Sequence, residues 1–329
     1  MHSDTLPSYP LWDEPQSILS RMIDNIERVI LGKRETIEAV LASLLAGGHV
    51  LLEDVPGVGK TQLVRSLAKT VDCSYSRIQF TPDLLPSDVT GVSVYHQRTG
   101  QFEFRPGPIF AQLVLADELN RTTPKTQAAL LEAMEEGQVT ADGETRRLPY
   151  PFMLLATQNP VDQEGTYGLP EAQLDRFLMR VGLGYPGLRQ EIEMLNRLSD
   201  PSPLDRLKPV VLQEELVQLQ RLVRRVHADE AILRYVVEIS SGTRDHKDLL
   251  LGASPRASAA LLTAAKARAF MNGRSYCIPD DVKGFSEPVL AHRLVLSPEA
   301  RLSGIRSDEL LQHIVSKIPV PGMRRAAGS

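Results

Sequence analysis

The segment Leu51–Val64, LLEDVPGVGKTQLV, decides the fold that we predict for this chain of 329 residues. It opens with an apolar run of strand length and closes with an amphipathic helical pattern, and a glycine-rich turn joins the two. Gly57 and Gly59 allow the backbone to curl around an anion, so that N–H groups at the start of a helix point inward. Lys60 adds a cation that can reach phosphate groups, and Thr61 adds a hydroxyl that can ligand Mg²⁺. The segment therefore predicts a phosphate-binding loop rather than a surface turn.

Asp54 departs from the usual pattern of such loops, which places a glycine there. The position lies at the exit of the strand, where a side chain can point away from the phosphates. We expect Asp54 to cap the turn by accepting a hydrogen bond from a nearby backbone N–H, as Asx turns do. The remaining residues of the loop are all present. Those that we expect to bind the ligand are Val55, Pro56, Gly57, Val58, Gly59, Lys60, Thr61 and Gln62.

A second buried strand, LVLADE at Leu113–Glu118, ends in two acids, and the first of them lies 57 residues after Lys60. An acidic pair at the end of a buried strand is costly unless a cation or a polar site receives it. Asp117 is placed to hold Mg²⁺ together with Thr61, directly or through water. Glu118 is placed to orient and deprotonate an attacking water. With the phosphate loop present, the pair favours nucleotide hydrolysis over a strand end capped by solvated acids.

Two further candidates follow later strands. Asn159 ends the run LLATQNP, where it could hold the attacking water or sense a γ-phosphate, or simply begin an Asn-Pro turn. Arg176 ends the short helical stretch LPEAQLDR. In a monomer it would be a surface arginine paired with a nearby acid. In a ring it would face the nucleotide of the neighbouring subunit and supply charge to the transition state.

Arg256 lies in the first turn of a predicted helix in the segment GASPRASAALL. Ser254 has the character of an N-cap, and Pro255 that of a first helical residue. A cation at this end of a helix opposes the helix dipole at a cost of about 0.3–1 kcal/mol. The placement suggests an anionic partner, for which a γ-phosphate bound to the core domain would serve. The alternative is an arginine that faces solvent.

The composition narrows the class of protein. The formal net charge of -4 and the pI of about 6.0 give no bulk basic field, so we expect no nucleic-acid partner. The isolated Cys73 and Cys277 fit neither a disulfide framework nor a zinc site. The longest apolar-looking run, Ala39–Leu52, is too short and too interrupted to span a bilayer, and the polar N-terminus is no signal peptide. We expect a cytoplasmic protein.

Apolar runs of strand length alternate with helical patterns as far as residue 186, which predicts a parallel sheet wound with helices. Beyond that point every segment has a helical pattern, and a linker with three prolines covers about residues 200–210. We therefore expect an α/β nucleotide-binding core at residues 1–186 and a helical domain at residues 187–329. The predicted strands are His49–Glu53, Ser76–Phe80, Leu113–Ala116, Phe152–Thr157 and Met179–Leu183.

Two insertions interrupt the core pattern. Val92–Phe104 alternates apolar and polar residues around a Thr-Gly turn, and Gln138–Leu148 turns on Asp142-Gly143, a strong hairpin signal. They are either edge decorations of the sheet or elements that project from the core to move or to grip a substrate.

The chain resembles the MoxR branch of the AAA+ ATPases. The matching stretches include FTPDLLPSDVTGV, GPIFAQLVLADELNRTTPKTQAALLEAMEEGQVT and PFMLLATQNPVDQEGTYGLPEAQLDRF, and more loosely GASPRASAALL. The resemblance covers about residues 25–290. It implies a five-stranded core with hairpin insertions and a helical lid, with ATP bound between core and lid.

The resemblance also assigns roles by position. Lys60 and Thr61 would be the Walker-A pair, and Asp117 and Glu118 the Walker-B pair. Arg180 would be a less suitable arginine finger than Arg176. The other implied residues are Asn159 as sensor 1, Arg176 as the arginine finger, Arg256 as sensor 2, and Val29, Ile30 and Gly32 beside the adenine.

We therefore predict a Mg²⁺-dependent ATPase that works as a ring, expected to be a hexamer, and remodels, matures or loads cofactors into partner proteins. The family resemblance implies proteins with von Willebrand factor A domains as possible partners. The alternatives are the ATPase subunit of a metal chelatase, a nucleic-acid motor, and a nucleotide-dependent scaffold with little turnover. The first alternative shares every site residue, so only the partner distinguishes it.

Overall fold

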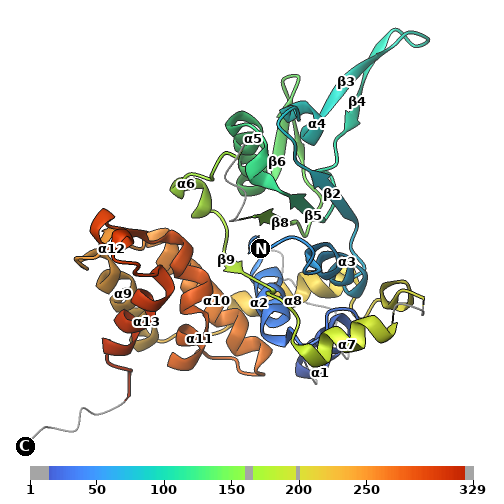
Figure 1. The fold of residues 1–329 in the computed structure, drawn as a ribbon. Coiled ribbons are helices and arrows are strands. Elements are labelled where there is room, and N and C mark those ends of the chain that lie inside the picture. Colours follow the sequence, from blue (N-terminus) through green and yellow to red (C-terminus); the bar gives the residue numbers. More distant parts are fainter. Residues whose placement is uncertain (1–14, 160–165, 198–200, 323–329) are drawn as a thin grey trace, which may run out of the picture.

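The computed structural model describes residues 15–159, 166–197 and 201–322. Its centre is a five-stranded parallel sheet with the strand order β2-β5-β8-β1-β9 (Figure 1). This confirms the predicted parallel sheet. The strands are β1 (Val50–Glu53), β2 (Tyr75–Gln79), β5 (Leu113–Asp117), β8 (Met153–Gln158) and β9 (Met179–Val181).

The register of the sheet brings polar strand ends to one edge. Gln79 of β2 is opposite Asp117 of β5, and Glu53 of β1 is opposite Gln158 of β8. Because all these strands are parallel, their carboxyl ends meet at the same edge, which is where open α/β sheets bind ligands.

Both faces of the sheet are buried, which explains the continuously apolar strands. In β1, Val50 and Leu52 belong to one hydrophobic cluster, whereas Leu51 belongs to a second cluster on the other face. In β5, Leu113 and Leu115 join the first cluster, and the two residues that alternate with them join the second. The helices of the core are α1 (Pro15–Glu27), α2 (Arg34–Ala46), α3 (Lys60–Thr70), α4 (Pro86–Thr90), α5 (Pro124–Glu136) and α6 (Glu171–Leu174).

The C-terminal part is mainly helical and shares the first cluster with the core. Gln220 donates from its side-chain amide to the carbonyl of Leu44 in α2 at 2.7 Å. The predicted division at residue 186 stays a prediction. None of the described helices combines the length and apolar character that a bilayer crossing needs. The helices are α7 (Leu188–Asn196), α8 (Gln213–Arg225), α9 (Glu230–Arg244), α10 (Pro255–Met271), α11 (Pro279–Leu290), α12 (Pro298–Leu302) and α13 (Ser307–Lys317).

One expectation about this part is wrong. Not every element after residue 186 is helical, because β10 (Leu249–Leu251) pairs antiparallel with β11 (Val295–Leu296). Strands of three and two residues are too short to produce a periodic pattern in the sequence. Single-turn helices also occur at η4 (Pro203–Arg206) and η5 (Ala291–Arg293).

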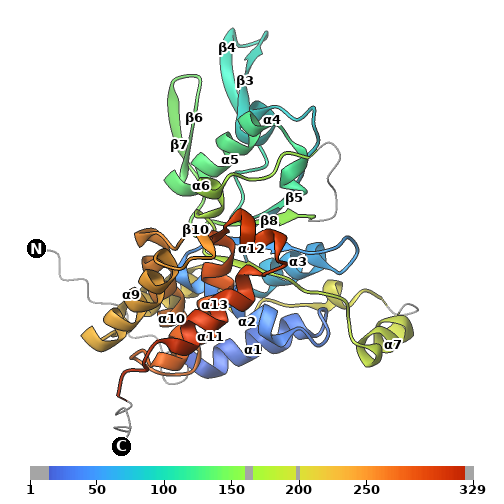
Figure 2. The same ribbon diagram turned by 60° about the vertical axis from the view of Figure 1, so that its left-hand side comes forward.

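The two insertions form two hairpins, each a two-stranded sheet of its own. Figures 1 and 2 show both projecting from the same end of the core, so they do not extend the edge of the central sheet. The guanidinium of Arg146 lies over the ring of Phe104 at 3.9 Å, and this contact links the hairpins. The strands are β3 (Gly91–His96) and β4 (Gln101–Pro106), and β6 (Gln138–Ala141) and β7 (Glu144–Arg147).

Candidate active site

The glycine-rich loop connects β1 directly to the N-terminus of α3. Gly57 and Gly59 have φ values of 85° and 98°, in the left-handed region that favours glycine. A Cβ on Gly57 would meet nothing within 4 Å, so the backbone conformation rather than crowding requires glycine there. The Lys60 ammonium donates to the carbonyls of Asp54 at 2.8 Å and Val55 at 3.2 Å. The loop thus curls around its own lysine, at the end of a helix that favours anions.

The charge of Lys60 depends on its surroundings. Partial burial lowers the pKa of Lys60 from its usual value, and the negative charges of Asp54, Asp117 and Glu118 oppose that shift. A phosphate group would act in the same direction as these carboxylates, because an added negative charge favours the protonated amine.

Asp54 is buried and holds three backbone N–H groups. Its Oδ1 accepts from the N–H of Val55 at 2.9 Å, and its Oδ2 accepts from Leu183 at 2.6 Å and Gly184 at 2.7 Å. The predicted cap on the turn is confirmed. The carboxylate also ties the exit of β1 to the segment after β9, a role that a glycine could not fill.

Asp117 and Glu118 are aligned by a residue of the neighbouring strand. Thr157 of β8 donates its hydroxyl to Asp117 Oδ1 at 2.7 Å and accepts the backbone N–H of Glu118 at 2.7 Å. Glu118 has a φ of 57°, an unusual conformation for a residue other than glycine. Such strain is typical of functional sites and re-aims the carboxylate where the strand ends.

The side chains of β2 hold both acids in place. Arg77 donates to Asp117 Oδ2 from Nε at 3.0 Å and from Nη2 at 2.6 Å. Gln79 accepts from Arg77 Nη2 at 2.7 Å and donates to Glu118 Oε2 at 2.7 Å. Sequence reasoning missed both residues. The sequence feature that could have indicated them is their spacing: two residues apart in a strand, Arg77 and Gln79 lie on the same face, beside the acids.

These groups surround a pocket of about 350 Å³ at the carboxyl edge of the sheet. The structure therefore brings together the glycine loop, the acid pair and Asn159. The side chain of Ile30 lies beside Gly59, so the segment expected to line the adenine is next to the loop. The lining residues are Pro56, Gly57, Gly59, Lys60, Thr61, Gln62, Arg77, Gln79, Asp117, Glu118, Thr157 and Asn159.

The donor set suits Mg²⁺ bound through a nucleotide. Thr61 and Asp117 both line the pocket. Within the described part of the chain no group of three or more His, Cys, Asp or Glu residues could hold a metal by itself. Mg²⁺ characteristically takes one or two protein oxygens and completes its shell with phosphate oxygens and water. A hydroxyl and a carboxylate beside a phosphate loop fit that requirement.

Arg176 and Arg256 meet on one carboxylate outside the pocket. Arg176 Nε lies 3.1 Å from Glu135 Oε2, and Arg256 Nη2 lies 2.6 Å from Glu135 Oε1. Neither arginine lines the pocket. The predicted N-cap is confirmed, since Ser254 Oγ accepts the N–H of Ala257 at 3.1 Å. The anionic partner of Arg256 within this chain is thus an α5 carboxylate, and the predicted roles of both arginines stay predictions.

A buried arginine fixes the segment that carries Arg176. Arg293 of η5 pairs with Asp175 Oδ1 at 2.7 Å and donates to the carbonyl of Phe177 at 2.7 Å. Burial lowers the pKa of Arg293, and the Asp175 carboxylate opposes the shift. The helical part thereby positions the residues on both sides of Arg176, a connection that no sequence motif indicated.

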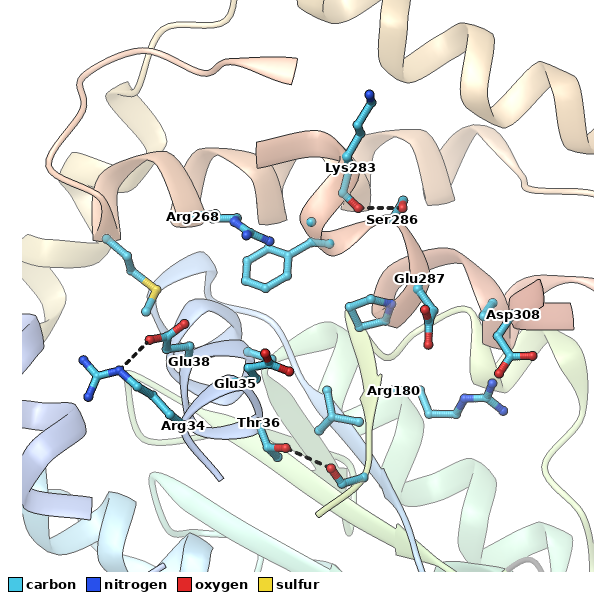
Figure 3. Close-up of a pocket in the computed structure, with 18 of the residues that line it drawn as sticks. Arg34, Glu35, Thr36, Glu38, Arg180, Arg268, Lys283, Ser286, Glu287 and Asp308 are labelled. Carbon is cyan, nitrogen blue, oxygen red and sulfur yellow. Dashed lines mark hydrogen bonds and ion pairs between the residues drawn. The ribbon is translucent and has the colours of Figure 1, made fainter. Parts of the chain in front are cut away.

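A larger cleft of about 920 Å³ lies between α2 and β9 of the core and helices α10, α11 and α13 (Figure 3). Arg180 on the core side and Glu287 on the helical side each have a partner on their own side of the cleft. Arg180 lies 2.8 Å from Glu53, and Gln312 donates to Glu287 at 2.8 Å. The cleft contains none of the residues predicted to bind nucleotide. Arg180, the weaker candidate for an arginine finger, therefore has a partner within its own core.

Comparisons with known proteins agree with this geometry. Residues 49–179 match the family described as "ATPase family associated with various cellular activities (AAA)", and residues 241–314 match the "AAA lid domain". The Bacillus subtilis protein YeaC is 53% identical over 94% of this chain and 97% of its own length. The Mycobacterium tuberculosis protein named chaperone MoxR1 is 40% identical over 92% of this chain and 82% of its length.

The fold is also similar to a solved structure. The crystal structure of a "putative ATPase" from Cytophaga hutchinsonii superposes with a TM-score of 0.87 at 40% sequence identity. The match covers 93% of this chain and 96% of the other. The α/β core, the hairpins and the C-terminal helical lid therefore belong together as one known architecture.

Proposed function

Because the chain belongs to the MoxR family of AAA ATPases, we propose that it hydrolyses ATP in the 350 Å³ pocket with the help of Mg²⁺. One observation carries the proposal. The glycine loop, the two acids and Asn159 come from separate strands, yet all of them line this pocket. A nucleotide scaffold with little turnover would not need Glu118 held by both Gln79 and Thr157.

Each residue of the pocket has a distinct role in this proposal. The backbone N–H groups after Gly57, together with Lys60, bind the phosphates. Thr61 and Asp117 would hold Mg²⁺, which would neutralise the charge that develops on the phosphate oxygens. Glu118 accepts the proton of the attacking water and Asn159 orients that water, which is positioning and general-base chemistry.

The two arginines require a second subunit in this proposal. Arg176 and Arg256 share Glu135 and lie outside the lining of their own pocket. Charge supplied to a neighbour's nucleotide would complete the site. A contact in which one face meets a different face of the next copy closes into a ring when the rotation between successive copies adds up to a full turn. We expect a hexamer that lies in the cytoplasm.

The work done with ATP is proposed from the family. The relative named chaperone MoxR1 supports a chaperone-like motor that remodels partner proteins, or matures them by loading cofactors. The partners implied by the family resemblance are proteins with von Willebrand factor A domains. The acidic balance of the chain gives no support to a nucleic-acid substrate.

The deciding experiment compares Glu118→Gln with Lys60→Ala. The first variant should bind a fluorescent ATP analogue as tightly as wild type, with turnover reduced by about 10²-fold or more, because the general base is lost. The second should lose binding. Normal turnover by Glu118→Gln would remove the assignment of the base. Proteins retained on an immobilised Glu118→Gln variant in ATP, but not in its absence, identify the clients.

A further inference from the structure

Helix α7 presents its apolar side to solvent. Leu188, Ile192 and Leu195 follow the spacing of one helical face and are 77%, 50% and 61% exposed. No residue of the helix is buried. Surface helices of globular proteins usually turn such a face toward the core. Among the residues that the structure describes, the apolar stripe of α7 (Leu188, Ile192 and Leu195) is not buried against any other element.

Polar residues make the contacts of α7 with the rest of the molecule. The side chain of Gln190 packs against Gly32, in the segment expected to line the adenine. Arg197, directly after the helix, donates to the carbonyl of Arg28 at 2.9 Å. The helix is therefore anchored beside the nucleotide pocket by its polar side. Figure 2 shows it standing at the margin of the molecule, where another protein can reach it.

A second exposed apolar surface lies on the lid. Leu250 of β10 and Leu302 of α12 are 70% and 90% exposed. They line a hollow of about 370 Å³ together with Leu296, Pro298 and Arg301. We call these five residues the lid patch. Figure 1 places α12 and α7 on opposite sides of the molecule, so the lid patch does not meet the α7 stripe of its own chain.

The charges next to the two surfaces are complementary. Arg301 of the lid patch makes no ion pair with any described residue, and Glu191 beside the α7 stripe makes none either. An arginine at one apolar surface and a glutamate at the other would attract each other across a contact.

The lid patch lies close along the chain to Arg256 and to Arg293. Leu250 lies six residues before Arg256, and β11 begins two residues after Arg293, which holds Asp175 beside Arg176. Ser254 also donates to Asp175 at 3.1 Å. A partner that binds the lid patch therefore binds the part of the lid that carries Arg256 and holds Asp175, whereas a partner that binds α7 is beside the segment expected to line the adenine.

We propose that the lid patch of one copy docks on the α7 stripe of the next copy. This head-to-tail contact brings Arg176 and Arg256 of the first copy toward the nucleotide pocket of the second. The inference rests on the proposed ring and names its contact surfaces. The two surfaces in this contact differ from each other, as a ring of more than two copies requires.

Disulfide trapping tests the contact. The double variant Ile192→Cys/Leu302→Cys, oxidised in the presence of ATP with Glu118→Gln to prevent turnover, should form a ladder of cross-linked chains on non-reducing gels. Each single cysteine variant should stay uncross-linked, because in a head-to-tail contact the two positions meet each other and not themselves. Cross-linking by Ile192→Cys alone would instead show a symmetric contact through α7 and would overturn the proposal.

Sedimentation velocity supplies an independent measurement. Ile192→Gln and Leu302→Ser should each raise the protein concentration at half-assembly by roughly tenfold, since central apolar contacts carry much of an interface. Val237→Ser is the matched control, because Val237 of α9 is 51% exposed and lies outside both surfaces. Unchanged assembly of the first two variants overturns this contact alone. A wild-type protein that stays monomeric in ATP overturns both the contact and the ring, whereas ATP hydrolysis is judged separately by Glu118→Gln.

Discussion

At the scale of single residues, Asp54 shows how a departure from a motif acquires a structural role. Its carboxylate accepts hydrogen bonds from Val55, Leu183 and Gly184, so one side chain satisfies three N–H groups, of which that of Leu183 is buried. Hydrogen bonds to a charged group contribute more than neutral ones, and leaving buried donors unpaired is costly. The residue that interrupts the glycine pattern thereby joins the loop to the strand at the edge of the sheet.

We expect Asp54→Ala to lower the free energy of unfolding by about 3 kcal/mol, because three N–H groups lose their acceptor. Asp54→Asn keeps one oxygen acceptor and should lose less. Urea denaturation measures both, with Asp83→Ala as a surface control, because Asp83 is exposed. Equal stability of Asp54→Ala and wild type would contradict the role assigned to the carboxylate.

Arg77 is a cation already bound to the Asp117 carboxylate, which we expect to help hold the metal ion. Its guanidinium reaches Asp117 Oδ2 twice, and Thr157 holds Oδ1. Removing this competing cation by Arg77→Gln should tighten the binding of a fluorescent ADP analogue several-fold in Mg²⁺ and leave binding in EDTA unchanged. Arg98→Gln in the first hairpin is the control. If Arg77→Gln weakens binding of the ADP analogue equally in Mg²⁺ and in EDTA, Arg77 contacts the phosphate instead.

At the scale of elements, the strands could be predicted and their side-chain networks could not. Continuous apolar runs such as those of β1 and β5 arise because both faces of the sheet are covered, and this leaves a direct trace in the sequence. The two acids at the end of β5 were recognisable because they directly follow such an apolar run. Arg77 and Gln79 were missed because their meaning depends on β2 pairing with β5, a contact between distant segments.

His49 joins two of these strands and is sensitive to pH. Its Nδ1 accepts the N–H of Leu154 at the start of β8 at 3.0 Å, which requires the neutral ring. Burial lowers the pKa of His49 to about 4, and a backbone hydrogen bond with Met134 opposes the shift. The unfolded chain binds this proton below its usual pKa of about 6.5, whereas the folded chain does not until about pH 4.

The contribution of His49 to stability is therefore complete above about pH 6.5 and decreases as the pH falls toward about 4. Denaturation of wild type and His49→Gln at several pH values isolates this contribution from that of the carboxylates. The difference in unfolding free energy between the two proteins should shrink across this window. A difference that is constant from pH 7 to pH 4 would contradict a His49 ring that stays neutral in the folded protein.

At the scale of the whole molecule, the packing of the lid against the core sets the positions of Arg176 and Arg256. The lid holds the Arg176 segment through Arg293, and Glu135 gathers Arg176 and Arg256 outside their own pocket. Sequence motifs singled out these two arginines as candidate site residues. They could not predict the shared carboxylate, because α5, α6 and α10 meet only through the packing of the lid against the core.

Mixing two inactive variants tests whether the arginine acts between subunits. Arg176→Ala should bind ATP and hydrolyse it about 10³-fold more slowly, since an arginine finger stabilises the transition state rather than the bound nucleotide. Lys60→Ala should lack both binding and turnover. In a mixture, a Lys60→Ala subunit offers an intact Arg176 to the intact pocket of an Arg176→Ala neighbour, so activity should return as the two proteins exchange subunits.

Arg180→Ala, whose ion pair with Glu53 lies within one core, is the control and should keep its activity. A mixture that stays inactive although both variants assemble would place the action of Arg176 within its own chain, because only a residue acting across the contact can be supplied by a subunit that cannot bind ATP.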